Sequence, residues 1–135
     1  MAPFSEPLPD IIGELAQYER NRAQARYVVR MRRVVNGVAL LATLAGGVAA
    51  LVPRNRTYFL YHVAVIITQN AVYNPTVRAG LRELEALDVR VRLARARVPA
   101  PDDPEAVSIV VAQRAAMLKI AEAQLYFHAA NALLG

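Results

Sequence analysis

Few side chains in this sequence could perform acid–base or metal chemistry. His62 and His128 are far apart and fit no ligand spacing such as HExxH, so we interpret both as helix histidines that form hydrogen bonds. The absence of Cys excludes disulfides and Cys-based zinc or redox sites. Glu83, Glu85 and Asp88 lie among arginines and are typical of a solvated, salt-bridged surface. We therefore predict no catalytic, cofactor-binding or metal site, no small-molecule substrate and no enzymatic activity.

Arginine is the residue type whose placement is most informative. The chain carries a net charge of +5, with six arginines and no acid in residues 20–33 and six arginines against three acids in residues 78–97. Such clusters serve as lipid-headgroup anchors, as docking surfaces for acidic partners or as contacts to nucleic acid. Nucleic acid is disfavoured, because no aromatic side chains alternate with the arginines as stacking platforms. The predicted headgroup or partner anchors are Arg30, Arg32, Arg33, Arg54, Arg56, Arg78 and Arg82.

Two stretches without charged side chains lie between these clusters. Residues 34–53 read VVNGVALLATLAGGVAALVP, and residues 57–77 carry no charge when His62 is neutral. About 20 apolar residues, at about 1.5 Å each, cross the hydrocarbon core of a bilayer. The turn between the stretches allows only an antiparallel hairpin, and Asn74–Pro75 should end the second helix. We therefore predict a transmembrane helical hairpin over 34–77, with spans at 34–53 and 57–74.

The hairpin prediction includes an orientation and a packing face. The outer flanks carry more arginine than the connecting turn, so both termini should lie on the cytoplasmic or matrix side. Insertion of 34–53 is marginal, because glycine and alanine replace many larger apolar residues. Small residues four positions apart permit close helix approach in lipid. The predicted helix-packing interface consists of Gly37, Ala42, Thr43, Gly46, Gly47 and Ala50.

The remaining elements are also predicted to be helical, which gives an all-α protein. Residues 1–9 are rich in proline and should form an extended arm. Asp10 is a suitable N-cap for an Arg-rich amphipathic helix over 10–33. The order of this lead-in (ELAQYERNRAQARYVVRMRR), two spans with a tight turn and a long final helix resembles the two-span SLATT-type modules. The resemblance lies in the layout and the lead-in and carries no residue role.

Two helices are predicted to follow the spans and to form an extramembrane segment over 76–135. Apolar residues recur at helical spacing over 76–98 and predict one amphipathic helix. Asp103, Pro104 and Glu105 predict the start of a last helix over 104–134, because they supply a cap, a first-turn proline and a first-turn acid. The amphipathic stripe consists of Val77, Leu81, Leu84, Leu87 and Val91.

The sequence thus favours a non-catalytic accessory or structural subunit of a larger membrane assembly. The expected partners are other protein subunits and lipid headgroups, and a respiratory or other energy-transducing complex in a mitochondrial or bacterial inner membrane is the favoured host. A membrane-containing virion comes next. Two alternatives stay open: a soluble helical protein of a virion or nucleoprotein particle, and a small two-span channel or pore-forming effector.

Overall fold

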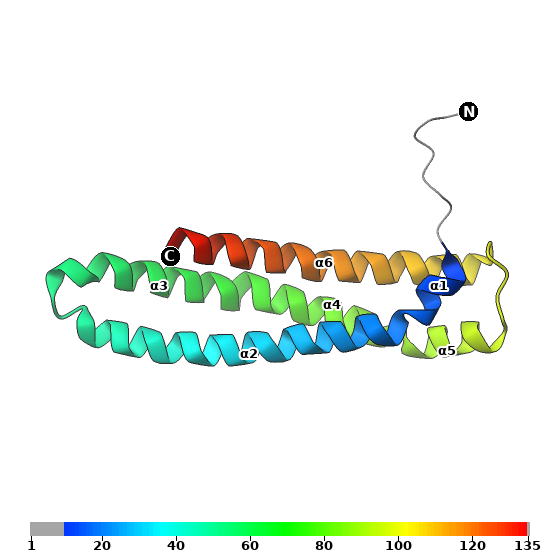
Figure 1. Cartoon of the computed structure of the whole chain (residues 1–135), viewed down its shortest axis with the longest axis horizontal. Helices are drawn as coiled ribbons and strands as arrows, with labels where there is room; N and C mark the ends of the chain where they lie inside the picture. The colour runs from blue at the N-terminus through cyan, green and yellow to red at the C-terminus, as the bar shows by residue number, and fades with distance from the viewer. Residues whose placement is uncertain (1–9, 135) are drawn as a thin grey trace, which may run out of the picture.

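The computed structural model describes residues 10–134, and these residues form helices and connecting turns without a strand, which confirms the all-α prediction. The predicted arm over 1–9 lies outside the described residues. α2 runs along one side of an elongated bundle, α3 to α5 return antiparallel to it, and α6 lies along them (Figure 1). The elements are α1 (Ile11–Ala16), α2 (Tyr18–Ala49), η1 (Pro53–Asn55), α3 (Arg56–Thr68), η2 (Gln69–Tyr73), α4 (Asn74–Ala86), α5 (Asp88–Ala96) and α6 (Pro104–Leu134).

The helix starts follow local capping chemistry. Asp10 accepts a hydrogen bond from the Gly13 backbone N–H at 3.0 Å, which caps α1. Asp103 accepts one from the Ala106 N–H at 3.2 Å, so α6 begins at Pro104. The caps satisfy N–H groups that have no acceptor within the helix.

The second uncharged stretch does not end where its proline suggests. The helical path continues from α3 through η2, a π-helical turn, into α4. Pro75 occupies the first turn of α4, where its missing N–H breaks no hydrogen bond of that helix. The backbone N–H of Asn74, the residue before Pro75, donates to the carbonyl of Gln69, five residues earlier, as in a π-helix. The predicted helix end at Asn74–Pro75 is therefore wrong.

Among the described residues, no helix combines the length and the apolar character needed to cross a membrane. The transmembrane part of the fold prediction is therefore not supported. α2 joins the apolar stretch to an Arg-rich first half in one continuous 32-residue helix. α3 has only 13 residues before the π turn. The elements do form the antiparallel hairpin of α2 and α3 that the short turn demands (Figure 1).

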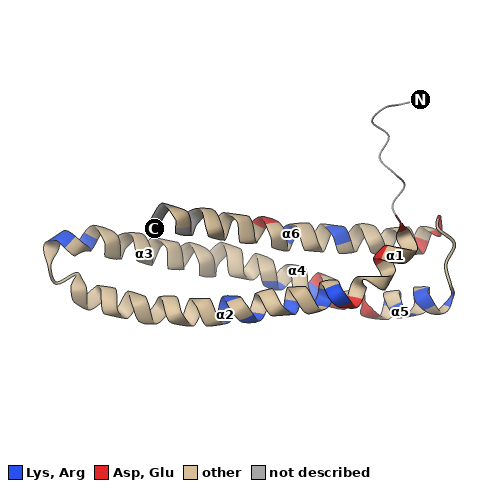
Figure 2. Ribbon diagram, viewed as in Figure 1, with Lys and Arg blue, Asp and Glu red and all other residues tan. Residues whose placement is uncertain are grey.

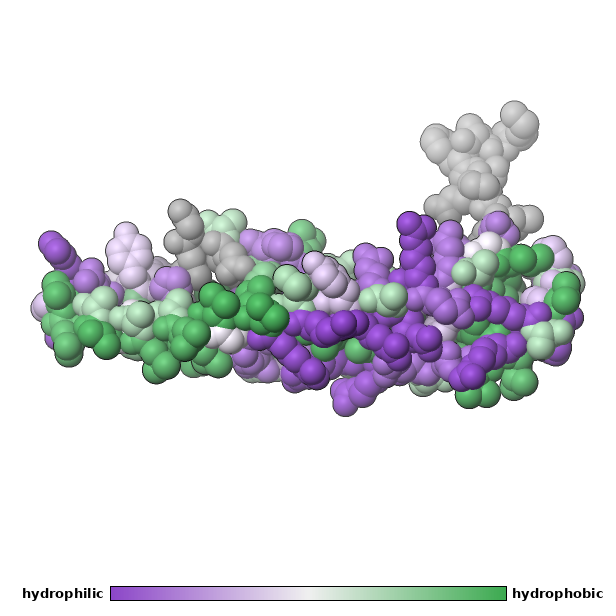
Figure 3. Space-filling view, turned by 60° about the horizontal axis from the view of Figure 1, so that its bottom comes forward, coloured by the Kyte–Doolittle hydropathy of each residue, from purple (hydrophilic) through white to green (hydrophobic). Residues whose placement is uncertain are grey.

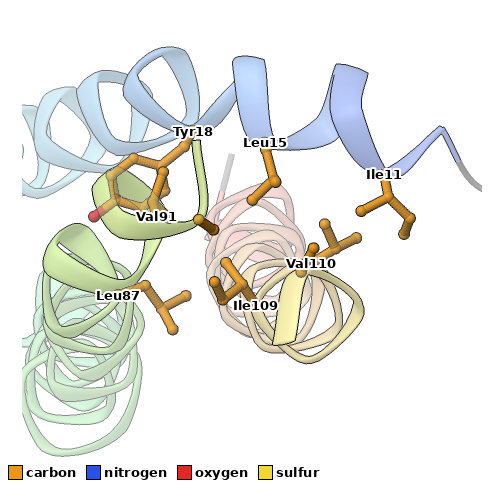
Figure 4. Close-up of a cluster of buried hydrophobic side chains, with 9 residues drawn as sticks. Ile11, Leu15, Tyr18, Leu87, Val91, Ile109 and Val110 are labelled. Carbon is orange, nitrogen blue, oxygen red and sulfur yellow. The ribbon is translucent and has the colours of Figure 1, made fainter. Parts of the chain in front are cut away.

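The hydrophobic core lies in the half of the bundle that is remote from this hairpin. Ile11, Leu15 and Tyr18 pack against residues of α5 and α6 (Figure 4). The predicted helix over 76–98 is broken into α4 and α5 by a turn at Leu87, whose side chain remains buried. A second cluster joins α2, α4 and α6 through Ala25, Val29, Val77, Leu84, Ala116, Ile120 and Ala123.

A close contact at Gly80 brings α4 and α6 together. A Cβ atom at this position would lie 2.6 Å from Ile120 Cγ1 and 3.2 Å from the Ala116 carbonyl oxygen. Only a residue without a side chain fits that approach. Small residues therefore do set a helix contact here, at a position for which the sequence had given no role.

Candidate interaction surface at the uncharged end of the bundle

The hairpin of α2 and α3 exposes apolar side chains instead of burying them. No residue within 33–68 is buried, although this range is the most apolar part of the chain. We call residues 34–68 the apolar end. The hairpin projects past the end of α6, so two helices alone cannot enclose a core (Figure 1). Ten large residues there are at least 59% exposed: Val34, Val38, Leu41, Leu44, Val48, Leu51, Tyr58, Leu60, Tyr61 and Ile67.

The predicted helix-packing residues occupy different places within the apolar end. A Cβ atom on Gly46 or Gly47 would lie 3.6 Å from the Phe59 ring, so α3 meets α2 through this ring. Gly37 has no neighbour within 4 Å of its Cβ position. The Thr43 hydroxyl donates to the Ala39 carbonyl at 2.8 Å within its own helix. Ala42, Thr43 and Gly46 also line a shallow cavity with Phe59 and His62, and Ala50 is half-buried where α2 ends.

Charges are concentrated at the opposite end of the bundle (Figure 2). Residues 20–82 contain no Asp or Glu. The expected salt-bridged surface exists, because Glu83, Glu85 and Asp88 pair with Lys119, Arg26 and Arg22 at 2.5, 3.1 and 2.7 Å. Further pairs join Arg95 to Glu19, Arg90 to Glu105 and Arg114 to Glu14. These pairs connect different helices and give the charged end an internal electrostatic balance.

A belt of arginines without carboxylate partners separates the two ends. The arginine belt consists of Arg30, Arg32 and Arg33 on α2 and Arg78 and Arg82 on α4. None of the five forms an ion pair within the described part of the chain. Figure 3 shows the hydrophilic middle of one face next to hydrophobic residues on the hairpin. Five of the seven predicted anchors therefore lie together at the border of the apolar end. The other two, Arg54 and Arg56, flank the turn at its tip.

Arg32 is the buried member of the belt. Its side chain lies inside the bundle, and the residue is only 7% exposed. Its guanidinium donates to the Asn74 side-chain oxygen at 3.0 Å and to the Ala123 carbonyl at 3.1 Å, and lies 4.7 Å from the Phe127 ring centroid. No hydrogen-bond acceptor among the described residues meets its Nε. Burial without a counter-charge lowers the pKa of this guanidinium.

Contacts at the charged end shift the pKa of several titratable groups. The Tyr18 hydroxyl donates to the Leu84 carbonyl at 2.5 Å, and burial raises the pKa of Tyr18. A hydrogen bond from Arg95 lowers the pKa of Glu19, and one from Arg90 lowers the pKa of Glu105. These shifts follow from structural contacts, and the groups are distributed over several helices. They do not converge on one site.

The remaining predicted residues lie in the core or on the surface. Val77, Leu84, Leu87 and Val91 of the stripe are buried, and Leu81 is half-buried. His62 is exposed on the hairpin, whereas His128 contacts the neighbouring Phe127 ring. Among the residues that the structure describes, no three His, Asp or Glu side chains gather where they would hold a metal ion.

No protein-family model, curated protein or solved structure matches this chain. The candidate surface is a two-helix apolar end, bordered by arginines that form no ion pair with the described residues.

Proposed function

We propose that the protein is a non-catalytic subunit of a larger membrane assembly, in which the apolar end is embedded and the charged end stays in water. The observation that carries the proposal is the absence of any buried residue between 33 and 68, where ten large apolar side chains are at least 59% exposed. Monomeric soluble proteins rarely expose a contiguous apolar surface of this kind, and such surfaces mark contacts with a membrane or a protein.

The position of the charges favours a membrane over a purely aqueous partner. The apolar end has charged side chains only at its tip, Arg54 and Arg56, and at its base it meets the arginine belt. Arginines at the border between apolar and aqueous phases extend their charged groups to the headgroups. The helical stretches 34–49 and 57–73 would extend about 24 Å and about 25 Å at the usual helical rise of about 1.5 Å. These lengths approach the hydrocarbon thickness of about 30 Å.

Neither helix is suited to stand in lipid alone, so the proposal includes helix partners. The apolar end contains Asn36, and Gln69 and Asn70 follow it directly in η2. Asn36 and Asn70 already share a hydrogen bond of 2.9 Å across the two helices, which reduces the cost of burying both amides. Gly37 leaves open space on the outer surface of α2, where a partner helix fits closely. An accessory subunit of an energy-transducing complex is the favoured role.

Alkaline carbonate extraction tests the proposal on the full chain in its native membrane fraction. An embedded protein stays in the pellet at about pH 11, and the pair Leu41→Glu with Leu44→Glu should shift it to the supernatant because two buried carboxylates oppose insertion. Val89→Glu with Leu93→Glu is the matched control, since these two apolar residues are exposed at the charged end. Quantitative release of the unmodified protein would contradict membrane embedding and favour a soluble particle component.

A further inference from the structure

A small polar cavity lies within the arginine belt, between α2 and the η2–α4 segment. Its volume is about 60 Å³, and it is lined by Val29, Arg32, Arg33, Asn36, Asn70, Asn74, Val77 and Arg78. A water molecule needs roughly 15 Å³ of such space. The cavity therefore has room for several water-sized groups or a small anion. Three arginines and three asparagines line it, and no carboxylate is among the described residues that line it.

The floor of the cavity holds the positive charge of Arg32, which forms no ion pair with the described residues. Arg32 is 7% exposed, and its acceptors among the described residues are the neutral oxygens of Asn74 and Ala123. Its Nε has no acceptor among the described residues. A buried cation without a counter-ion is costly, and an anion beside it would offset that cost. Arg33 and Arg78 are exposed and bring two further guanidinium groups to the mouth of the same cavity.

The asparagines add neutral donors around the same space. Asn74 uses its side-chain oxygen to accept from Arg32, and Asn36 uses its oxygen to accept from Asn70. The amide nitrogens of Asn36 and Asn74 have no acceptor in the described part of the chain. These nitrogens and the arginines provide donors from two helices, which suits a group whose oxygens accept in several directions.

We propose that this cavity binds the phosphate group of an anionic ligand, with Arg32 at its floor and Arg33 and Arg78 at its mouth. A phosphate monoester or diester supplies the negative charge that Arg32 lacks and the acceptors that the surrounding donors need. The cavity opens at the border of the apolar end, which is the depth that a lipid headgroup would occupy under the proposed function. That the phosphate belongs to a lipid headgroup rests on the proposed function. That the cavity binds a phosphate group does not.

The test measures two probes on the full chain and two double variants. Arg33→Gln with Arg78→Gln removes both arginines at the mouth of the cavity. Arg30→Gln with Arg82→Gln removes the same charge from the same two helices, but neither residue lines the cavity. All four side chains are exposed, so both variants should retain the fold.

The first probe is inorganic phosphate, titrated by calorimetry into protein held in a neutral detergent. The second is phosphatidylglycerol, measured by native mass spectrometry after reconstitution in vesicles of phosphatidylcholine with about one third phosphatidylglycerol. Loss of one charge-assisted contact weakens binding by about tenfold or more. We expect the variant at the mouth to weaken retention of at least one probe by that factor and the matched control to change it much less.

The outcomes separate the two sources and the two proposals. Retention of phosphatidylglycerol that depends on Arg33 and Arg78 supports a headgroup site, and binding of phosphate alone supports a site for a soluble phosphate. Absence of both, or equal weakening in the two double variants, would overturn the site and leave only a diffuse charge effect. Release of the protein by carbonate would contradict the membrane proposal while the phosphate titration in detergent still decides the cavity.

Discussion

At the scale of single residues, the arginine belt and the charged end are held together by contacts whose partners are far apart in the sequence. The Tyr18 hydroxyl reaches the Leu84 carbonyl, and Gly80 allows α4 to approach the Ala116 carbonyl of α6. Arg32 reaches Asn74 and Ala123. Each contact fixes the register of two helices, so single substitutions at these positions should have measurable effects.

Gly80→Ala should destabilise the bundle by about 1–3 kcal/mol, because the new Cβ would overlap Ile120 and crowd a backbone oxygen. Gly37→Ala is the matched control, since its Cβ meets open space, and the higher helix propensity of alanine should stabilise by about 0.5–1 kcal/mol. Thermal unfolding followed by circular dichroism in detergent measures both. Equal midpoints for the two variants would contradict the close approach of α4 and α6.

Tyr18 should make stability depend on alkaline pH. Because burial raises the pKa of its hydroxyl, the folded state holds this proton more tightly than the unfolded chain. Its contribution is complete below the ordinary tyrosine pKa of about 10 and is lost as pH rises through the folded pKa. Tyr18→Phe should remove about 1 kcal/mol at neutral pH, through the lost hydrogen bond, and reduce the alkaline loss. An unchanged slope of stability between pH 9 and about 11 would contradict this assignment.

At the scale of elements, helix α2 changes character along its length. The first half of α2 packs into the core through Ala25 and Val29, whereas its second half belongs to the apolar end. Ion pairs join the first half of α2 to α4 through Arg26 and Glu85 and to α5 through Arg22 and Asp88. The two halves should respond differently to substitution.

The clamp between α2 and α5 should contribute modestly to stability. Arg22→Gln should destabilise by up to about 1 kcal/mol, because its pair with Asp88 is half-buried and 2.7 Å long. Arg20→Gln, which removes the same charge two residues away from a position without a described ion pair, should have almost no effect. Unfolding midpoints compare the two variants. An equal loss of stability in the two variants would show that net charge, and not the pair with Asp88, sets the effect.

Polar substitution on the hairpin should spare the fold and impair assembly. Leu41→Gln with Leu44→Gln alters two side chains that are 69% and 70% exposed, so the unfolding midpoint in detergent should change little. Leu84→Ala, in the core, should cost about 2–5 kcal/mol. If the hairpin is the contact surface, co-purification with the native assembly should fall more for the Leu41/Leu44 variant than for Leu84→Ala. A hairpin variant that still co-assembles fully would argue against it.

At the scale of the whole molecule, the bundle places its core at the charged end and its most apolar sequence on the surface. Composition and periodicity predict the helices well where signals are local, as at the caps Asp10 and Asp103 and along the stripe from Val77 to Val91. The continuation past Pro75 could not be predicted, because the sequence gives no local signal for the π turn that joins α3 to α4.

The candidate site could be predicted only in outline. The sequence locates the arginines next to the uncharged stretches, but it does not tell which of them find carboxylates. Arg22 and Arg26 do, whereas Arg30, Arg32 and Arg33 of the same helix contact no carboxylate in the part of the chain that the structure describes. The cavity at Arg32 depends on how α2 is rotated against α4, and that rotation is set by distant core contacts. The small-residue pattern likewise indicated a contact in the hairpin and missed Gly80.

The most direct test of the central claim is the environment of the apolar end in a bilayer. The chain has no Cys, so a single nitroxide label can be placed at Leu44→Cys or, as a control, at Val111→Cys, residues that are 70% and 60% exposed. In reconstituted vesicles, power saturation should show that the label at position 44 is accessible to oxygen and shielded from a water-soluble nickel complex. The label at position 111 should be accessible to the nickel complex and less accessible to oxygen. Equal and high nickel accessibility at both positions would contradict the account.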